Sequence, residues 1–315
     1  MTISIVVPLY NEEESLEKLY GAVADGLVSL GCPWDIVFVD DGSTDASMEI
    51  LRRLHGEHDN VTVLSLGRNL GKSAALAVGF REAEGDVVVT MDADLQDDPS
   101  EIPAMVRELE SGFDVVSGWK KERKDPLSKR LPSKLFNWVT GRLSGVRLHD
   151  MNCGLKVYKR DVVKTIKVYG ELHRYTPVLA HFAGFHVTEL AVRHHARQFG
   201  KSKFGPERFA RGLFDLVTIL FLRRYVTRPL HLFGMVGGVL FLGGFAIGIY
   251  LTVIKIMGEA IGRRPLLTLG ILLMVIGVQI VSVGLVAEML TSMSVERVSY
   301  PVRERLDRSG GSSGA

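Results

Sequence analysis

Two long stretches without charged residues constrain the C-terminal part of this chain more than any other feature. Residues 229–254 and 265–287 contain no Asp, Glu, Lys or Arg. Each stretch exceeds the roughly 20 residues that an α-helix needs to cross the hydrocarbon core of a bilayer. The segment 255–264 between them is too short for anything but a tight connection. The sequence therefore predicts a transmembrane helical hairpin over residues 229–290.

A hairpin returns the chain to its starting side, so both large ends lie on one side of the membrane. No signal peptide precedes Ile3, and basic residues gather before the first span, which by the positive-inside tendency places both ends in the cytoplasm. Arg263 and Arg264 in the connection oppose this orientation. The basic residues before the first span are Arg208, Arg211, Arg223, Arg224 and Arg228.

The segment before the hairpin has an amphipathic pattern. Phe209, Leu213, Leu216 and Leu220 recur on one helical face, which predicts a helix lying on the membrane surface, with a core helix as the alternative. The expected organisation is an N-terminal domain over residues 1–205, this helix over 206–228, the hairpin over 229–290 and a C-terminal tail over 291–315.

Short apolar strands alternate four times with segments of helical periodicity in about the first 110 residues. The predicted strands cover residues 3–8, 35–39, 61–64 and 87–91. This alternation predicts an α/β fold with a mostly parallel, doubly wound, Rossmann-like sheet. The loops that follow the strands then share one edge of the sheet, where such folds bind ligands.

The fourth predicted strand ends in two carboxylates, Asp92 and Asp94, separated by the small residue Ala93. Two carboxylates in this spacing are able to hold a Mg²⁺ or Mn²⁺ ion that completes its shell with substrate phosphate and water. The pair thus indicates a phosphorylated ligand. A solvated turn at the end of a strand is the alternative, because acidic pairs end many strands.

Several other patterns exclude common functions. Residues 67–73 read Gly-x-x-x-Gly-Lys-Ser, one residue short of the phosphate-binding loop, and no Gly-x-Gly-x-x-Gly follows the first strand. The lone Cys32 and Cys153 predict neither a disulfide nor a zinc site. His194 and His195 would face opposite sides of a strand, which argues against a shared metal. We expect no nucleic-acid partner.

Four sequence blocks, in this order, resemble the signature of family 2 glycosyltransferases with a GT-A fold. They are residues 5–12 (Ile-Val-Val-Pro-Leu-Tyr-Asn-Glu), 39–45 (Val-Asp-Asp-Gly-Ser-Thr-Asp), 68–72 (Arg-Asn-Leu-Gly-Lys) and 92–96 (Asp-Ala-Asp-Leu-Gln). The resemblance implies a nucleotide-sugar site made of Pro8, Tyr10, Glu12, Val39, Asp41, Lys72, Asp92, Ala93, Asp94, Lys120, Arg197 and Lys203. It implies a Mg²⁺ or Mn²⁺ site made of Asp92, Asp94 and Gln96.

Three later blocks, residues 129–137, 149–160 and 197–203, are similar to the polyprenyl-phosphate (dolichyl-phosphate) glycosyltransferase branch, whose bacterial members include proteins with two C-terminal spans. This resemblance implies an acceptor-phosphate site at Lys129, Arg130 and Ser133. It implies catalytic roles for Asp94, Asp150, Lys129 and Arg197. Where the branch often has arginine, this chain has Lys120, Lys129 and Lys156, which keep the charge but lose the bidentate fork.

The expected protein is an integral membrane enzyme of a bacterial cell membrane. It would transfer a hexose, with inversion, from UDP-glucose or, alternatively, GDP-mannose to polyprenyl phosphate, with a modified pentose as a further alternative to the hexose. It would also associate with copies of itself. A processive polysaccharide synthase is disfavoured, because such enzymes carry a Gln-x-x-Arg-Trp block and more spans, whereas Trp34, Trp119 and Trp138 do not follow arginine. A catalytically silent nucleotide-sugar sensor or membrane scaffold is the alternative of another class.

Overall fold

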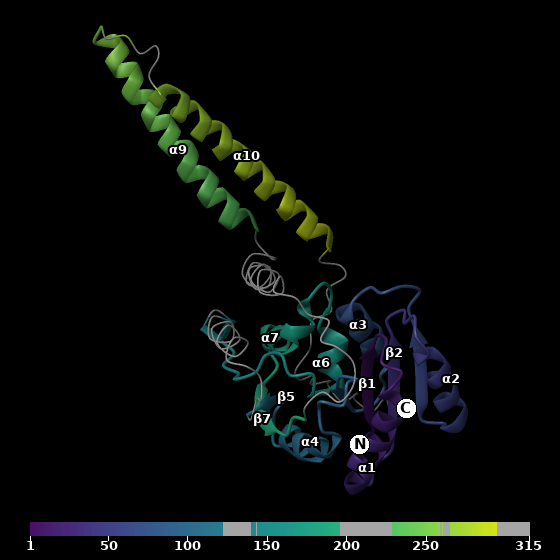
Figure 1. The fold of residues 1–315 in the computed structure, drawn as a ribbon. Coiled ribbons are helices and arrows are strands. Elements are labelled where there is room, and N and C mark those ends of the chain that lie inside the picture. The colour runs from purple at the N-terminus through teal and green to yellow at the C-terminus, as the bar shows by residue number, and fades with distance from the viewer. Residues whose placement is uncertain (122–139, 143, 196–228, 259, 261–264, 295–315) are drawn as a thin grey trace, which may run out of the picture. The chain divides into compact units, whose positions relative to one another are not determined.

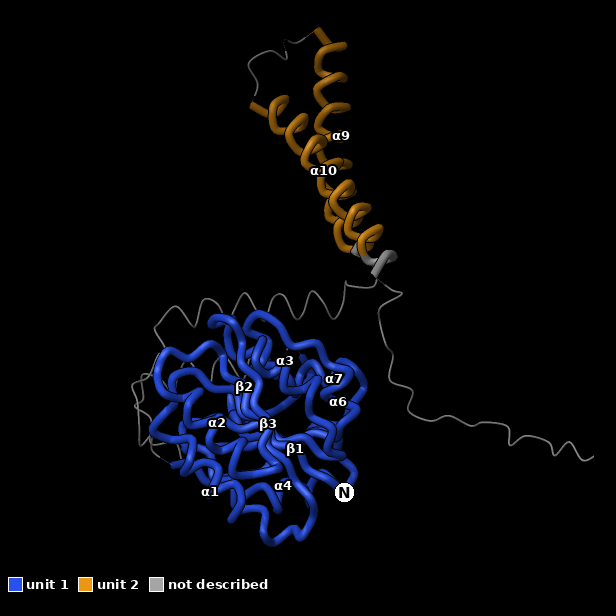
Figure 2. The backbone as a smooth tube through the Cα atoms, turned by 90° about the vertical axis from the view of Figure 1, so that its right-hand side faces the viewer, with its two compact units in different colours: residues 1–216, 300–315 blue, residues 217–299 orange. Residues whose placement is uncertain are grey.

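The computed structural model describes residues 1–121, 140–142, 144–195, 229–258, 260 and 265–294. The chain separates into two compact units, shown in Figure 2. One unit comprises residues 1–216 with 300–315, and the other comprises residues 217–299. The predicted interfacial helix over residues 206–228 lies outside the described residues, as does most of the C-terminal tail.

The first unit is built on a seven-stranded sheet with the order β3-β2-β1-β4-β6-β5-β7 (Figure 1). Strand β6 runs antiparallel to both of its neighbours, and every other pair of neighbours is parallel. The predicted mostly parallel α/β sheet is therefore confirmed. The strands are β1 (Ile3–Leu9), β2 (Trp34–Asp40), β3 (Val61–Ser65), β4 (Val87–Thr90), β5 (Val115–Lys120), β6 (Lys156–Lys159) and β7 (Val187–Val192).

Helices cover both faces of this sheet. Those in the described part of the first unit are α1 (Leu16–Leu27), η1 (Val28–Leu30), α2 (Ser47–Glu57), α3 (Lys72–Glu82), η2 (Pro99–Glu101), α4 (Ile102–Glu110), α6 (Arg160–Thr165), η3 (Leu172–Tyr175) and α7 (Thr176–Phe182). Helices α1, α2 and α4 bury their apolar faces against Ile5 and Val7, whereas α3 and α6 pack with Val6 and Val88. Successive strand side chains point to opposite faces, and the central strands β1 and β4 are accordingly apolar except for the buried Ser4 and Thr90.

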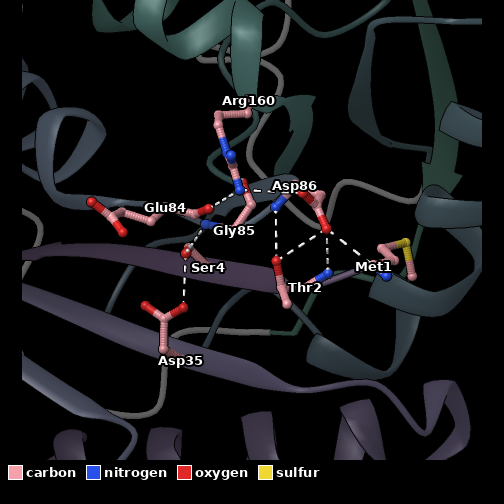
Figure 3. Close-up of polar contacts among 8 residues, drawn as sticks. All are labelled: Met1, Thr2, Ser4, Asp35, Glu84, Gly85, Asp86 and Arg160. Carbon is pink, nitrogen blue, oxygen red and sulfur yellow. Dashed lines mark hydrogen bonds and ion pairs between the residues drawn. The ribbon is translucent and has the colours of Figure 1, made fainter.

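A polar network holds the amino end of β1 to the segment that leads into β4 (Figure 3). The Thr2 backbone N–H donates to Asp86 Oδ2 at 2.8 Å, and the Gly85 N–H donates to Ser4 Oγ at 2.8 Å. Arg160, directly after β6, donates from Nε to the Gly85 carbonyl at 3.1 Å. These bonds lie at the edge of the sheet opposite the carboxyl ends of β1 and β4, and they leave those ends to the loops.

The second unit contains two long helices, α9 (Pro229–Ile256) and α10 (Pro265–Ser294), which lie side by side in Figures 1 and 2. Both are long and apolar enough to cross a membrane, and most of their large apolar side chains are exposed. A soluble helix would bury such side chains. The predicted hairpin of two spans is therefore present in the structure, and α10 ends at Ser294, beyond the expected end at residue 290.

Glycines allow α9 and α10 to approach closely. A Cβ atom at Gly237 would lie 2.6 Å from the Gly277 carbonyl oxygen, and a Cβ at Gly277 would lie 2.6 Å from that of Gly237. Small residues at helix contacts are typical of membrane hairpins, because packing rather than water exclusion holds such helices together. Glu288 of α10 accepts a 3.1 Å hydrogen bond from the backbone N–H of Leu230, and this bond satisfies one of the open donors at the start of α9.

Candidate active site at the carboxyl edge of the sheet

The loop after β4 carries the two aspartates singled out in the sequence. Asp94 is 7% exposed, and its Oδ1 accepts a 3.2 Å bond from the backbone N–H of Gln96. Leu95, between Asp94 and Gln96, has φ of +58°, a left-handed conformation that leucine rarely adopts. Such strain persists where the surrounding structure enforces it, often at functional sites. The tight turn at Leu95 sets the directions of Asp94 and Gln96.

Asp92 is held by a lysine from a different loop. The Lys72 ammonium, at the start of α3, forms an ion pair with Asp92 Oδ1. Burial alone would raise the pKa of Asp92, but the charge of Lys72, with Lys120 and Lys156 behind it, brings that pKa far below its ordinary value. Asp92 therefore stays ionised at every physiological pH, as a metal ligand or an acceptor of hydrogen bonds requires.

Asp41, directly after β2, organises the loop that carries Lys72. Its two carboxylate oxygens accept the backbone N–H groups of Leu70 at 2.7 Å and of Gly71 at 2.9 Å. These are the N–H groups that a phosphate-binding loop would turn toward its ligand. Their use by Asp41 agrees with the expectation that residues 67–73 do not cradle phosphate. It also gives Asp41 a structural role that the sequence did not suggest.

The loop after β1 is joined to the loop after β2. The Asn11 N–H donates to Ser43 Oγ at 2.8 Å, and the Thr44 N–H donates to Asn11 Oδ1 at 2.8 Å. Asn11 has φ of +53°, which asparagine tolerates better than most residues. The Glu12 N–H donates to Ser47 Oγ at 3.0 Å. These bonds keep Tyr10 and Glu12 on the same edge as Asp41.

A buried ion pair lies behind the aspartate loop. Lys120 Nζ, at the end of β5, is 3.2 Å from Asp97 Oδ1, and the two side chains are 13% and 1% exposed. Burial raises the pKa of the Asp97 carboxyl even though Lys120 lies beside it. A Cβ atom at Gly154 would lie 2.7 Å from both Asp92 Cγ and Asp97 Oδ2. Because glycine has no Cβ, the carboxylates of Asp92 and Asp97 are both able to lie close to the backbone of residue 154.

A small cavity of about 80 Å³ opens beneath the Lys72–Asp92 pair. Its walls come from the ends of β1 and β4, from residues 152–158 and from η3, and they include the cationic side chains of Lys156 and Arg174. His173 ties η3 to α3, because its ring Nδ1 pairs with Ser73 Oγ at 2.9 Å and its backbone N–H donates to the same oxygen at 3.1 Å. Burial lowers the pKa of His173 well below its ordinary value, so its ring is neutral.

The structure thus gathers many of the residues that the sequence proposed for the site. Pro8, Lys72 and Asp92 line the cavity, while Val39 and Ala93 are buried beneath the loops. Asp150 is 2% exposed, and its Oδ1 accepts the Asn152 N–H at 3.1 Å. Five of the proposed residues lie outside the described part of the chain, namely Lys129, Arg130, Ser133, Arg197 and Lys203.

His149 and His195 have carboxylate partners. His149 pairs with Glu189 of β7 and stacks on Trp119 with ring centroids 4.3 Å apart. His195 Nε2 lies 3.1 Å from Asp98 Oδ2. Each histidine is therefore engaged by a neighbouring carboxylate, and neither forms part of a metal cluster in the described part of the chain.

The donor set at the aspartate loop fits a hard divalent cation. Asp92, Asp94 and Gln96 offer only oxygen ligands, which Mg²⁺ and Mn²⁺ prefer. Among the described residues no group of three or more His, Cys, Asp and Glu side chains converges on one point. A cation held by one or two carboxylates and completed by substrate phosphate and water needs no such group.

Sequence reasoning missed Asp97, Gly154 and Arg174, and it singled out Lys156 only through the resemblance. Asp97 closely follows the Asp-x-Asp pair, and the structure buries it against Lys120. Nothing in the local run of Asp97, Asp98 and Pro99 distinguished the aspartate that is fully buried from the one that remains partly exposed. Nothing in the local sequence around Arg174 indicated that it would reach the site.

Both parts of the chain match known protein families. Residues 4–167 match the family described as "Glycosyl transferase family 2", and residues 228–293 match the "GtrB C-terminal hairpin". The chain is 42% identical over 298 residues to the dodecaprenyl-phosphate galacturonate synthase of Rhizobium johnstonii, covering 92% of this chain and 88% of that protein. It is 39% identical over 295 residues to the undecaprenyl-phosphate 4-deoxy-4-formamido-L-arabinose transferase of Pseudomonas aeruginosa, covering 92% and 85%.

Two solved structures share the fold of the first unit. Mannosyl-3-phosphoglycerate synthase from Rubrobacter xylanophilus aligns with a TM-score of 0.55 at 19% identity, over 71% of this chain and 74% of that one. The M. tuberculosis glucosyl-3-phosphoglycerate synthase in complex with Mn²⁺ and UDP-glucose aligns with a TM-score of 0.51 at 22% identity, over 70% and 78%. With its fold, its Asp-x-Asp edge and its C-terminal hairpin, this chain belongs to glycosyl transferase family 2.

Proposed function

We propose that this membrane protein transfers a sugar from a nucleotide diphosphate sugar to the phosphate of a polyprenyl phosphate. The observation that carries the proposal is similarity along 92% of the chain, hairpin included, to two enzymes whose names specify polyprenyl-phosphate acceptors. The hairpin suits this acceptor, because a polyisoprenoid stays in the bilayer while its phosphate reaches a polar site. The N-terminal unit and the C-terminal tail are proposed to lie in the cytoplasm, where nucleotide sugars are made.

The transfer needs no strong base. A phosphate monoester is anionic at neutral pH, so one of its oxygens attacks the anomeric carbon. The bond from that carbon to the β-phosphate oxygen breaks, and the nucleoside diphosphate leaves with the electron pair. One in-line displacement inverts the configuration and involves no covalent glycosyl-enzyme. Rate enhancement then comes from holding the substrates in line and from neutralising the leaving group.

The described residues take the following roles in this proposal. Pro8, Tyr10, Glu12 and Val39 border the nucleotide, and Asp41 supports it by fixing the loop at residues 70–71. The ammonium groups of Lys72 and Lys120 place positive charge beside the departing diphosphate, and Asp150 orients the acceptor or a basic partner.

Asp92, Asp94 and Gln96 are proposed to hold Mg²⁺ or Mn²⁺, and a related fold binds Mn²⁺ together with a nucleotide sugar. When bound, the ion supplies further positive charge to the diphosphate. From the basic segments outside the described residues, Lys129, Arg130 and Ser133 are proposed to receive the acceptor phosphate, and Arg197 and Lys203 the donor.

The identity of the sugar is the least constrained part of the proposal. UDP-glucose was favoured, with GDP-mannose and a modified pentose as alternatives; one relative is named for galacturonate, which is none of these, and the other for 4-deoxy-4-formamido-L-arabinose, which is a modified pentose. All four sugars therefore belong in the test. Self-association through the membrane hairpin is also proposed, and the mass of the detergent-solubilised protein measures it.

A transfer assay tests the proposed function. Purified full-length protein, Mg²⁺ or Mn²⁺ and a short polyprenyl phosphate receive each labelled donor in a separate tube. We expect label in the lipid phase from one donor, dependence on the metal, and loss in Asp94→Ala. Asp59→Ala, an exposed aspartate before β3, is the matched control and should transfer normally. Nucleotide binding without transfer from any donor would favour the silent sensor or scaffold instead.

A further inference from the structure

The cavity beneath the Lys72–Asp92 pair has an unusual balance of charge. Part of its wall is apolar, formed by Leu76, Met91 and Tyr158, while Lys72, Lys156 and Arg174 bring three positive charges to it. Asp92 is the only acidic residue among the described residues that line it, and Lys72 already neutralises that carboxylate through their ion pair.

Lys156 is a buried ammonium without an ion-pair partner among the described residues, and the acidic charges that act on it, those of Asp92 and Asp150, do so from beyond ion-pair distance. It is 4% exposed, and Nζ donates a 2.6 Å hydrogen bond to the Cys153 carbonyl. Within the described ranges no carboxylate lies within ion-pair distance of it. A buried charge is costly unless an opposite charge or several hydrogen bonds compensate it. One carbonyl oxygen satisfies only one of the three donors of an ammonium group.

Arg174 of η3 is also incompletely satisfied. Its side chain is 7% exposed, and Nη2 donates to Glu171 Oε2 at 3.0 Å, which balances its charge. Its Nε is buried and has no hydrogen-bond partner among the residues that the structure describes. Buried donors in native proteins are nearly always paired, so an open one at the wall of a cavity points to a missing ligand.

We propose that Lys156 and Arg174 form a subsite for an oxyanion other than the donor's diphosphate, carried by the transferred sugar or by the lipid acceptor. An oxyanion supplies the missing negative charge for Lys156 and an acceptor for the open Nε of Arg174. Hydroxyl groups of a neutral sugar would accept hydrogen bonds here but would leave the charge unbalanced. This inference rests on the proposed function, because that function brings the substrates to this edge.

Two groups have the required chemistry. One is the carboxylate of a uronic acid as the transferred sugar, and the other is the phosphate monoester of the lipid acceptor. Both present at least two charged oxygens to a pair of cationic side chains. They arrive on different substrates, so binding experiments separate them.

The test measures binding by calorimetry at pH 7 with the full-length protein in detergent. In the first arm, UDP-glucuronate is compared with UDP-glucose, and GDP-mannuronate with GDP-mannose. In the second arm, farnesyl phosphate is compared with farnesol on protein saturated with the nucleoside diphosphate that it binds. Each comparison is repeated with Lys156→Met and Arg174→Met. Lys167→Met, an exposed lysine after α6, is the matched control.

A hydrogen-bonded charge pair is worth roughly a factor of ten or more in affinity. We expect the charged member of one pair to bind at least about tenfold tighter than its neutral partner to the wild type, and this preference to disappear in both variants. Loss in the first arm assigns the subsite to the sugar carboxylate, and loss in the second assigns it to the acceptor phosphate. Lys156→Arg should retain the preference, because it keeps the charge.

Unchanged preferences in both arms would overturn the inference. A loss of affinity for the nucleoside diphosphate alone, as large as the loss for the charged probe, would also overturn it, since the two cations would then serve the leaving group. Unchanged affinity of a variant for the nucleoside diphosphate also shows that the variant is folded. Failure of the proposed function is recognised separately. If the charged probe binds through Lys156 but no donor gives lipid-linked sugar, the transfer proposal fails and the oxyanion subsite stands.

Discussion

The uncompensated charge of Lys156 makes a quantitative prediction about stability and pH. Burial, together with the nearby charge of Lys72, lowers the pKa of Lys156 to about 8, against an ordinary value of 10.5, and outweighs the opposing charges of Asp92 and Asp150. Below pH 8 the folded protein therefore carries the full cost of a buried charge. Between pH 8 and 10.5 the folded state releases this proton while the unfolded state keeps it, so stability rises with pH. The whole difference corresponds to about 3 kcal/mol.

The measurement compares the wild type with Lys156→Met between pH 7 and 9. Over this range the Lys156 contribution should add about 1.4 kcal/mol to the wild type, or about 3 to 5 °C in its melting temperature. The difference between the two proteins isolates this contribution from other titrating groups. Burial raises the pKa of the Cys153 thiol to about 12, which lowers stability above pH 9 and sets the upper limit of the range.

Tryptophan fluorescence is a suitable readout, because Trp34, Trp119 and Trp138 all belong to the first unit and none lies in the hairpin. Thermal unfolding of the full-length protein in detergent is followed at each pH. Lys167→Met is the control and should show the pH dependence of the wild type. Parallel curves for the wild type and Lys156→Met would refute the reasoning, since Lys156 would then not be a buried cation without a partner.

Three further predictions concern backbone geometry. Gly154→Ala should cost about 1 to 3 kcal/mol of stability and most of the sugar transfer, because the new Cβ would clash with two carboxylates. Its control Gly56→Ala, which has open space around it in α2, should gain about 0.5 to 1 kcal/mol, and equal melting temperatures of the two variants would contradict this. Leu95→Asn should keep transfer activity, because asparagine tolerates a positive φ, whereas Leu95→Val should lose about 1 to 2 kcal/mol of stability, because branched residues do not. Equal activity and stability of the two variants would count against strain at this turn. In the hairpin, Gly237→Ala should lower the temperature at which detergent-solubilised protein aggregates, while Gly238→Ala, with no atom within 4 Å of its Cβ, should not; a similar drop in both would argue against close helix packing.

Much of the architecture follows from local patterns. The alternation of apolar strands and helical segments predicted the α/β class, and the structure confirms the four parallel strands from β1 to β4. Four ordered sequence blocks, including those around Asp41 and Asp92, indicated the family, which the comparisons confirm. These features are local, because hydrophobic periodicity and turn residues act within one element at a time.

Local sequence patterns did not predict the position of β6 in the sheet. Residues 156–159 form a short antiparallel strand between β4 and β5, and its partners are distant in sequence. This insertion carries Gly154 to Asp92 and Lys156 to the cavity. A strand of this length carries little periodicity of its own, and its place in the sheet depends on which neighbours remain unpaired.

The amino-acid sequence by itself determined that this chain folds as a mostly parallel α/β domain followed by a two-helix membrane hairpin, and that carboxylates follow its strands. Only the tertiary structure decided which charges are paired and which are left without a partner. Asp92 forms an ion pair with Lys72, and Asp97 forms one with Lys120, whereas Lys156 has no carboxylate partner among the described residues. The physical reason is that the cost of a charge depends on how much water the surrounding elements remove, and those elements come from distant parts of the chain.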